Sequence, residues 1–566
     1  MPGIERFLPL FLFFSVAGSA CTQELPSASA RATGGAGSVG AGQSGGTNAQ
    51  AGSGGTGSGG AGSGAVTGGG GGAGSGGAGG GAMPAAGMGG VPTTPPATVT
   101  VHLVPQQGTS ETQRINFAVP LAPGWLTNAA LVKVTSAGVE VPTFSRGLAN
   151  HADGSLRSVQ IQIDLALAAE MDVTVELGAS RTAAPLTAVP VEQTLVNPNG
   201  EQGPKVWAVL PAEWLSSSGF AGPLLPEAAV AGQPSSAWAS LCDYEANDVQ
   251  AFLESGYETD RAVWLFDRGT ALYRGYARRG DLNTLRSAHV ETSMYRNRIT
   301  GTGAASRNGI GDDAADDVKY NYSQNLALHY LLTGDDRFRE SAEDIALGMA
   351  ELWPDPGYRG GDDFWTERHA GFSLLAYDWA MIVSDDQAAQ FRDLADEAVD
   401  AYLALQTSYP AGYADENARC FAHTADAHGE GGAYFGCSPW MSAILGDALA
   451  QYALESSAGR AQEVRDALVK LGRIIARSGI QDDGRPYYFM GVGTAENMPD
   501  EYDEHYGESA YLIGMSWYFS GRTDTALQSA ANQLLERMAT DGTAPHIRSF
   551  NWQCRSAVMG PWYLQD

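Results

Sequence analysis

The sequence predicts a multidomain α+β protein, in which a small β-barrel or β-sandwich is followed by an (α/α) toroid of helical hairpins. Two changes of periodicity along the 566 residues support this prediction. Apolar and polar residues alternate over 98–178, as they do in strands with one buried face. Over 239–566 the apolar spacing becomes three and four, which is typical of amphipathic helices. A helical solenoid is the alternative for this second part.

The first 21 residues have the pattern of an export signal. Arg6 precedes an apolar run at 7–16, and small residues then lead to Cys21. The run is too short to cross a membrane as a helix. A small-residue stretch that ends in cysteine resembles a bacterial lipobox. We therefore expect Cys21 to be acylated and the protein to be an outer-membrane lipoprotein, with plain export to the outside of the cell as the alternative.

Residues 22–97 consist mainly of Gly, Ser and Ala. Such a segment cannot bury a core, and we expect it to be a disordered tether. No later apolar run is long enough for a transmembrane helix. The expected contact with a membrane is therefore the lipid anchor alone, and the folded part is expected to be a monomer.

Acidic residues outnumber basic ones in this chain. It has 63 Asp and Glu against 34 Lys and Arg, which gives a formal net charge of −29. A nucleic-acid-binding protein needs a basic face for the phosphates, so this class is excluded. The same charge slows the approach of a polyanionic substrate, unless the binding site is locally basic.

Four cysteines remain when Cys21 is set aside. An even number in an exported chain favours disulfides. A bridge between Cys420 and Cys437 would close a local loop, and one between Cys242 and Cys554 would join the ends of the helical part. The sequence does not fix this connectivity. A zinc site is less expected, because the chain has no C-x-x-C pair.

The β-domain is predicted from four alternating runs separated by Gly and Pro turns. The runs are 99–103, 115–119, 159–165 and 173–177. His151 lies just before the third run and is expected to be a turn residue. Residues 179–238 are Pro-rich and weakly patterned, which indicates a connector between the β-domain and the toroid.

The clearest helical hairpin lies at 316–352. Two apolar stripes at helical spacing are separated there by Thr333, Gly334 and Asp335, which form a short turn. The start of the hairpin carries more hydrogen-bonding side chains than a core helix needs. We expect these side chains to bind substrate; they are Tyr320, Asn321 and Tyr322.

Several segments resemble a known family. Residues 117–124, 138–142 and 152–158 are similar to the small N-terminal β-barrel domain of exo-rhamnogalacturonan-lyase-like proteins. Residues 266–281 and 328–335 resemble helix ends of the toroid that follows in those proteins. The resemblance implies an enzyme of the polysaccharide lyase type, which cleaves a uronate-containing glycan by β-elimination and has no cofactor.

In such lyases a cation or amide neutralises the uronate carboxylate, while His and Tyr remove the C5 proton and protonate the leaving oxygen. The resemblance implies that loops at one end of the helical ring supply these groups. The first stretch with this chemistry is 365–369. Arg368 is the candidate neutraliser, His369 the candidate base and Trp365 a candidate sugar platform. The plainer interpretation is a helix start whose histidine is satisfied by a neighbour.

The second stretch is the Gly-rich loop 420–434. His428 and Tyr434 are candidate catalytic residues, and His423 is a candidate substrate ligand. Two histidines five residues apart, with Asp426 or Glu430, also suit a divalent metal. We expect no metal, because the spacing matches no strong motif. A loop closed by a disulfide is the plainer interpretation.

The third stretch is 501–508, which opens a helix. His505 and Tyr506 are candidate catalytic residues, and Tyr502 is a candidate substrate ligand. Acidic residues at a helix start are favourable in themselves, which is the plainer interpretation. Trp440 and Tyr488 are further candidate platforms for sugar rings.

Two other functions stay open. A glycoside hydrolase would need two carboxylates across a cleft. The sequence offers many candidates, namely Asp312, Asp313, Asp316, Asp317, Asp362, Asp363, Asp482, Asp483 and Glu501. A non-catalytic, tethered glycan-binding protein would not bring His369, His428 and His505 together.

Overall fold

A computed structural model of the chain describes most residues from 97 onwards. These are residues 97–106, 111–232, 234–310, 315–358, 365–413, 415–428, 432–501, 503–543, 545–547 and 549–565. The predicted export signal, Cys21 and nearly all of the predicted tether lie outside them. No helix within these ranges is both long enough and apolar enough to span a bilayer.

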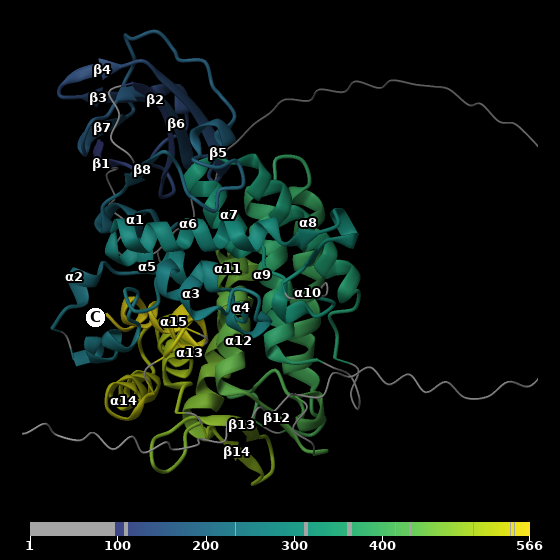
Figure 1. Cartoon of the computed structure of the whole chain (residues 1–566). Helices are drawn as coiled ribbons and strands as arrows, with labels where there is room; N and C mark the ends of the chain where they lie inside the picture. Colours follow the sequence, from purple (N-terminus) through teal and green to yellow (C-terminus); the bar gives the residue numbers. More distant parts are fainter. Residues whose placement is uncertain are drawn as a thin grey trace, which may run out of the picture. The chain divides into compact units, whose positions relative to one another are not determined.

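The β-domain consists of two antiparallel sheets (Figure 1). Five strands follow the order β4-β3-β7-β1-β8 and three follow the order β2-β6-β5. The strands are β1 (Thr98–Pro105), β2 (Thr112–Pro120), β3 (Val132–Ser136), β4 (Val139–Val141), β5 (Thr143–Asn150), β6 (Leu156–Ala166), β7 (Met171–Leu177) and β8 (Val206–Val209). Two separate sheets make this domain a sandwich. Its last strand, β8, pairs with β1 from within the segment expected to be a connector.

Short helices follow β8, and helical hairpins with short strands in the loops between them make up the rest of the described chain (Figure 1). The short helices are α1 (Ala212–Ser218), α2 (Glu227–Val230), α3 (Val249–Ser255) and α4 (Arg261–Trp264). The longer ones are α5 (Arg268–Arg279), α6 (Leu282–Asn297), α7 (Gln324–Thr333), α8 (Asp336–Leu352), α9 (Glu367–Val383), α10 (Ala388–Ser408), α11 (Pro439–Leu454), α12 (Ala458–Ser478), α13 (Tyr506–Phe519), α14 (Thr525–Asp541) and α15 (Phe550–Ala557), and α16 (Gly560–Leu564) ends the chain.

The odd-numbered helices from α5 to α15 form an inner ring. Each packs against the next, and α15 packs against both α13 and α5, so the ring closes on itself. The inner helices α9, α11 and α13 are buried nearly all round, whereas the outer helices α10, α12 and α14 each bury one face. Ring closure distinguishes this toroid from an open solenoid.

The predicted hairpin turn is present between α7 and α8. Gly334 ends α7 with a φ of +67°, a left-handed conformation that favours glycine. Asp335 begins α8, and its carboxylate accepts a hydrogen bond from the backbone N of Arg337. A short turn between an inner helix and the outer helix that follows makes the two antiparallel. The inner helices therefore begin at one end of the ring and finish at the other.

The three-stranded sheet is buried on both faces. One face is apolar, and the other places polar side chains against the C-terminal end of α7. Asn116 Nδ2 donates to Thr333 O at 2.7 Å, and Ser158 Oγ donates to Leu331 O at 2.6 Å. The last carbonyls of a helix have no partner within the helix, and these strand side chains satisfy them. These hydrogen bonds join the β-sandwich to the ring through backbone acceptors, and the ion pair between Arg146 and Asp336 adds a side-chain contact.

Two disulfides are present, Cys242–Cys554 and Cys420–Cys437. The first spans 312 residues and ties the segment before α3 to α15, the helix that closes the ring. The second spans 17 residues within the loop before α11. Both pairings suggested by the sequence are confirmed. Disulfides persist in oxidising compartments outside the cytoplasm, in keeping with an exported protein.

Asp378 is a fully buried acid on α9. Neither carboxylate oxygen has a hydrogen-bond partner among the described residues. Burial, together with the nearby charge of Glu455, raises its pKa well above the ordinary value. The folded state therefore favours the neutral acid, and the stability that this form contributes is lost as the pH rises through the raised pKa.

We expect Asp378→Asn to raise the thermal midpoint at pH 8, with the difference from the wild type shrinking towards pH 4. Each unit of pKa elevation corresponds to about 1.4 kcal/mol of unfolding free energy at high pH. Thermal unfolding followed by circular dichroism across this pH range measures the effect. Asp393→Asn, at an exposed site on α10, is the matched control and should leave the curve unchanged. Equal midpoints for Asp378→Asn and the wild type at pH 8 would contradict the prediction.

Candidate functional site

The candidate site lies where the inner helices begin. The first and third predicted stretches open α9 and α13, and both helices pack against α11, which starts at Pro439 beside Trp440. Three neighbouring helix starts thus bring the predicted residues to the same end of the ring. The strand β13 (Tyr487–Gly491) contacts α11 and adds Tyr488.

The Trp440 ring is the centre of this cluster. The His505 imidazole stacks on it with 4.5 Å between centroids and 6° between planes. The Tyr488 ring lies 5.5 Å from it, and the Arg368 guanidinium carbon lies 5.8 Å from its centroid. One indole therefore contacts residues from α9, β13 and α13. The Trp440 side chain is only 4% exposed, so it packs between these residues and connects them.

Arg368 is the only residue of α9 that is not fully buried. It makes no hydrogen bond or ion pair with any described residue, and its Nε atom is buried. The arginines inside the ring differ, because Arg274 and Arg555 both pair with Asp447. A guanidinium held over an indole and lacking a protein carboxylate is well suited to bind the carboxylate of a ligand.

Two more cations flank Arg368. The Arg261 guanidinium and the Lys319 ammonium lie 5.5 Å and 5.4 Å from the centroid of the Tyr320 ring. Burial and the charge of Arg368 lower the pKa of Lys319, although Asp317 opposes this effect. Lys319 is paired with Asp317 at 2.8 Å. Arg368 is therefore the cation of this group that remains for an anionic ligand, in a protein of net charge −29.

His505 is buried and faces carboxylates. Its Nδ1 lies 3.4 Å from Glu508 Oε1, and its Nε2 has no hydrogen bond to the described residues. Burial alone would lower the pKa of His505, but the hydrogen bond and charge of Glu508, with the charges of Asp500 and Glu504, raise it. Burial also raises the pKa of Glu504 to about 6. His505 thus resembles a base whose protonated form is stabilised by a carboxylate.

His369 is held between protein groups. Its Nδ1 lies 2.6 Å from Thr366 Oγ1 and its Nε2 lies 3.3 Å from Asp317 Oδ1. Burial lowers its pKa to about 4, so the ring is neutral at pH 7. Because both nitrogens face protein groups, His369 positions the first turn of α9, and with it Arg368.

His423 is also fully buried, and its Nε2 lies 2.7 Å from Glu367 Oε2. Glu367 Oε1 accepts a hydrogen bond from the backbone N of Ser438, just before α11. This pair joins the starts of α9 and α11, so it positions Trp440 and does not face solvent.

Several predicted residues lie in the surrounding structure. Trp365 is buried against Tyr402, and the side chains of Asn321 and Tyr322 bond to nearby backbone. Tyr434 packs on Phe489. Tyr506 is buried, and its burial together with the charges of Asp503 and Asp541 raises its pKa to about 12. Tyr502 and the side chain of His428 lie outside the described residues.

The carboxylates considered for hydrolysis are dispersed. Asp317 belongs to the cluster, whereas Asp316 pairs with Arg307 and Asp483 with Arg485. Asp482 and Glu501 are exposed. Four of the predicted carboxylates lie outside the described residues; they are Asp312, Asp313, Asp362 and Asp363.

The sequence reasoning missed three residues of this site: Arg261, Lys319 and Glu508. Glu508 follows His505 by one helical turn, a spacing that could have identified the pair. Lys319 is next to the predicted Tyr320. Arg261 carries no local signal, because α4 lies far from α9 along the chain.

A possible cation site lies elsewhere. Glu343, Asp385 and Asp386 bring carboxylate oxygens within 4.8 Å of one another, the only such group among the described residues. Asp385 is already paired with Arg339. In the second predicted stretch, Asp426 accepts a hydrogen bond from the backbone N of Gly432, and Glu430 lies outside the described residues.

No protein-family model matches this chain, and no curated protein is similar to it in sequence. Three solved structures share a likeness. A polysaccharide lyase is 12% identical and aligns over 58% of this chain and 96% of its own, with a TM-score of 0.37. A glycosyl hydrolase family 88 protein from Bacteroides vulgatus is 13% identical over 58% and 98%, with a TM-score of 0.38. A sugar epimerase from a ruminal bacterium is 14% identical over 54% and 87%, with a TM-score of 0.35. Likenesses of this size do not identify an activity.

Proposed function

We propose that this protein is a carbohydrate-active enzyme, a polysaccharide lyase that cleaves a uronate-containing glycan by β-elimination. The observation that carries the proposal is Arg368, a cation without a protein carboxylate, held over Trp440 beside His505. A neutral glycan would need no such cation. Arg261 and Lys319 lie nearby and add positive charge, although Lys319 is paired with Asp317.

In the proposed reaction, Arg368 binds the uronate carboxylate and makes the C5 proton more acidic. His505 Nε2 takes this proton, and Glu508 stabilises the imidazolium that forms. The electron pair left at C5 forms the C4–C5 double bond while the bond from C4 to the glycosidic oxygen breaks. The Tyr488 hydroxyl protonates the leaving oxygen. Trp440 holds His505 and Arg368 in position, and the proposed reaction uses no cofactor.

The test is an assay on a panel of anionic polysaccharides that records both new reducing ends and the ultraviolet absorbance of unsaturated uronate. A rise in both signals is the expected result and identifies the substrate. Reducing ends without the absorbance would show hydrolysis. No signal from either assay on any polysaccharide, with glycan binding intact, would contradict an enzymatic function.

The carboxylate beside His505 predicts a shift in pH dependence. Glu508→Gln removes the charge and hydrogen bond that raise the pKa of His505, while burial still lowers it. Because the base must be neutral to accept a proton, the acidic limb of the kcat/KM profile should move to lower pH. The weaker base should also reduce the maximal rate by at least about tenfold.

The pH–rate profile of purified Glu508→Gln measures this effect. Glu501→Gln, an exposed change at the same end of α13, is the control and should keep the profile of the wild type. An acidic limb that stays in place in Glu508→Gln would remove His505 from the role of base.

A glycoside hydrolase is the second candidate, because Glu504 has a pKa of about 6 and lies near Asp500 and Glu508. A carboxyl group whose pKa is raised towards neutral pH can act as a general acid towards a glycosidic oxygen. In that case Glu504→Gln should abolish the release of reducing ends, and Arg368→Gln should have little effect on a neutral glycan.

A further inference from the structure

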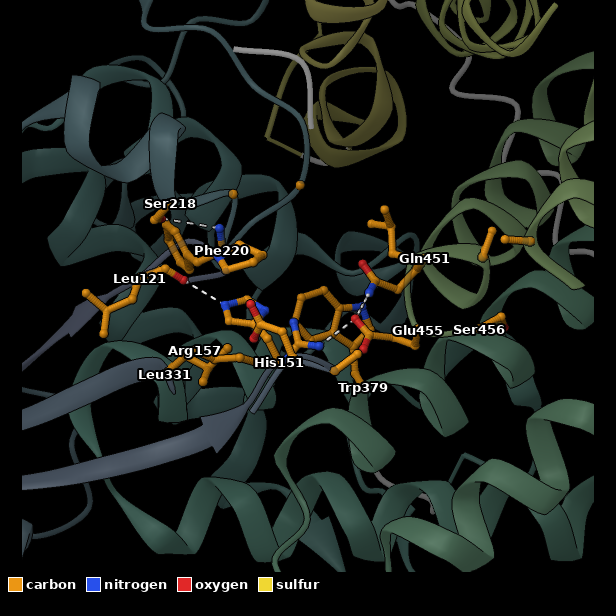
Figure 2. Close-up of a pocket in the computed structure, with 18 of the residues that line it drawn as sticks. Leu121, His151, Arg157, Ser218, Phe220, Leu331, Trp379, Gln451, Glu455 and Ser456 are labelled. Carbon is orange, nitrogen blue, oxygen red and sulfur yellow. Dashed lines mark hydrogen bonds and ion pairs between the residues drawn. The ribbon is translucent and has the colours of Figure 1, made fainter. Parts of the chain in front are cut away.

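A cavity of about 380 Å³ lies at the other end of the inner helices (Figure 2). The β-domain contributes Leu121, His151 and Arg157 to its wall, and the segment after α1 contributes Phe220. The ends of α7, α9 and α11 contribute further residues, among them Trp379, and the first turns of α12 contribute Ala461 and Arg465. Its volume falls at the lower end of the range of about 300–1,000 Å³ typical of small-molecule sites.

One buried donor in this wall has no acceptor. The Trp379 side chain is only 4% exposed, and its Nε1–H meets no acceptor among the described residues. Several buried indoles of the described residues lack an acceptor, and Trp379 is the one that borders this cavity. A ligand oxygen would supply the acceptor.

Two acids and two arginines line the cavity, and one of the arginines has no acidic partner. The Asp153 carboxylate accepts hydrogen bonds from the backbone N and the Oγ of Ser155. Arg157 and Glu455 neutralise each other at 2.5 Å. Burial, with the charge of Arg157, lowers the pKa of His151 to about 4, so His151 is neutral and its Nε2–H donates to Leu121 O at 2.9 Å. Arg465 has no ion pair with a described residue, and its Nε is buried without an acceptor.

The arginine also has a defined position, because its guanidinium carbon lies 5.8 Å from the centroid of the Phe519 ring. The cavity thus combines an apolar wall with two unmatched donors, one neutral and one cationic. A molecule with an apolar ring face, an acceptor oxygen and one negative charge has the complementary chemistry.

We propose that this cavity binds a small sugar acid of one or two rings, with the carboxylate at Arg465 and a ring oxygen or hydroxyl at Trp379. The choice of a uronate rests on the proposed function, because such sugars are the products of that reaction. The site is separate from the catalytic cluster, since it lies where the inner helices end and Trp440 lies where they begin. It retains a product and does not cleave it.

Isothermal titration of the full chain with galacturonate and with glucuronate tests the proposal. The titration uses the Arg368→Gln background, which removes the carboxylate partner of the catalytic cluster. One uronate should bind, and galactose should bind at least tenfold more weakly. Arg465→Gln should weaken uronate binding at least tenfold. Trp379→Phe keeps the apolar ring, removes the N–H, and should weaken binding severalfold.

Ala461→Met is the second variant, because Ala461 is buried in the cavity wall. It fills the space without removing a polar group, so it should abolish binding while the thermal midpoint stays the same or rises. Uronate binding that survives both Arg465→Gln and Ala461→Met, or no uronate binding at all, would overturn the proposal. Binding that depends on Arg465 in a protein without lyase activity would reject the proposed reaction and leave this site standing.

Discussion

Replacing Arg368 with glutamine is expected to lower kcat/KM on a uronate-containing polysaccharide by about 10²–10³-fold, the usual cost of removing a group that stabilises developing charge. Negative charge builds on the uronate carboxylate as the C5 proton leaves. α9 has no other unpaired cation that could stabilise this charge. Most of the loss should appear in kcat, because the interaction strengthens as the proton is removed.

The measurement is steady-state kinetics followed by the absorbance of unsaturated uronate. Arg368 makes no hydrogen bond or ion pair with the described residues, so Arg368→Gln should unfold at nearly the wild-type temperature. Arg286→Gln, a half-buried arginine on the outer helix α6, is the control and should keep full activity. Normal kinetics in a folded Arg368→Gln enzyme would falsify the assignment of the carboxylate site.

Removing the Cys242–Cys554 disulfide by a double substitution to serine is expected to lower the free energy of unfolding by about 4 kcal/mol or more. The bridge closes a loop of 312 residues, and the entropy that it removes from the unfolded chain grows with loop length. It also holds α15 where this helix contacts α5 and closes the ring. The expected result is therefore a large drop in stability.

Removing Cys420–Cys437, which spans 17 residues, should cost about 3 kcal/mol on the same scale. Chemical denaturation of the two double mutants, compared with the oxidised wild type, gives both values. A smaller loss for the long bridge than for the short one would mean that the ring stays closed without its covalent tie.

Local patterns predicted the hairpins, the turn at Gly334 and the alternating strands, because each depends on neighbours along the chain. They predicted one buried face for the strands, whereas Asn116, Ser158 and Gln160 are polar and buried against α7. A strand whose polar side chains lie under a helix end and a strand whose polar side chains face water show the same alternation of apolar and polar residues. The partner is more than 150 residues away, so period alone cannot separate the two cases.

The candidate site was predicted only in part, because some of its contacts join residues that are far apart along the chain. Helix starts with His, Arg and Trp were visible in the sequence, and the structure brings Arg368, Trp440 and His505 together. Which histidine keeps an available nitrogen was not visible. His369 and His505 each open a helix near carboxylates, but Asp317 reaches His369 from a distant loop, while Glu508 reaches His505 from its own helix.

The junction between the sandwich and the ring has an asymmetry that bears on how the protein can vary. The donors are side chains of the strands, and the acceptors are backbone oxygens at the end of α7. Substitutions on α7 that preserve the helix keep these oxygens in place, because the backbone supplies them. Substitutions at Asn116 or Ser158 remove a donor and leave a buried carbonyl without a partner. For these hydrogen bonds the identity of the side chain matters on the strand side, whereas α7, which is buried from Gln324 to Leu332, is constrained by its packing.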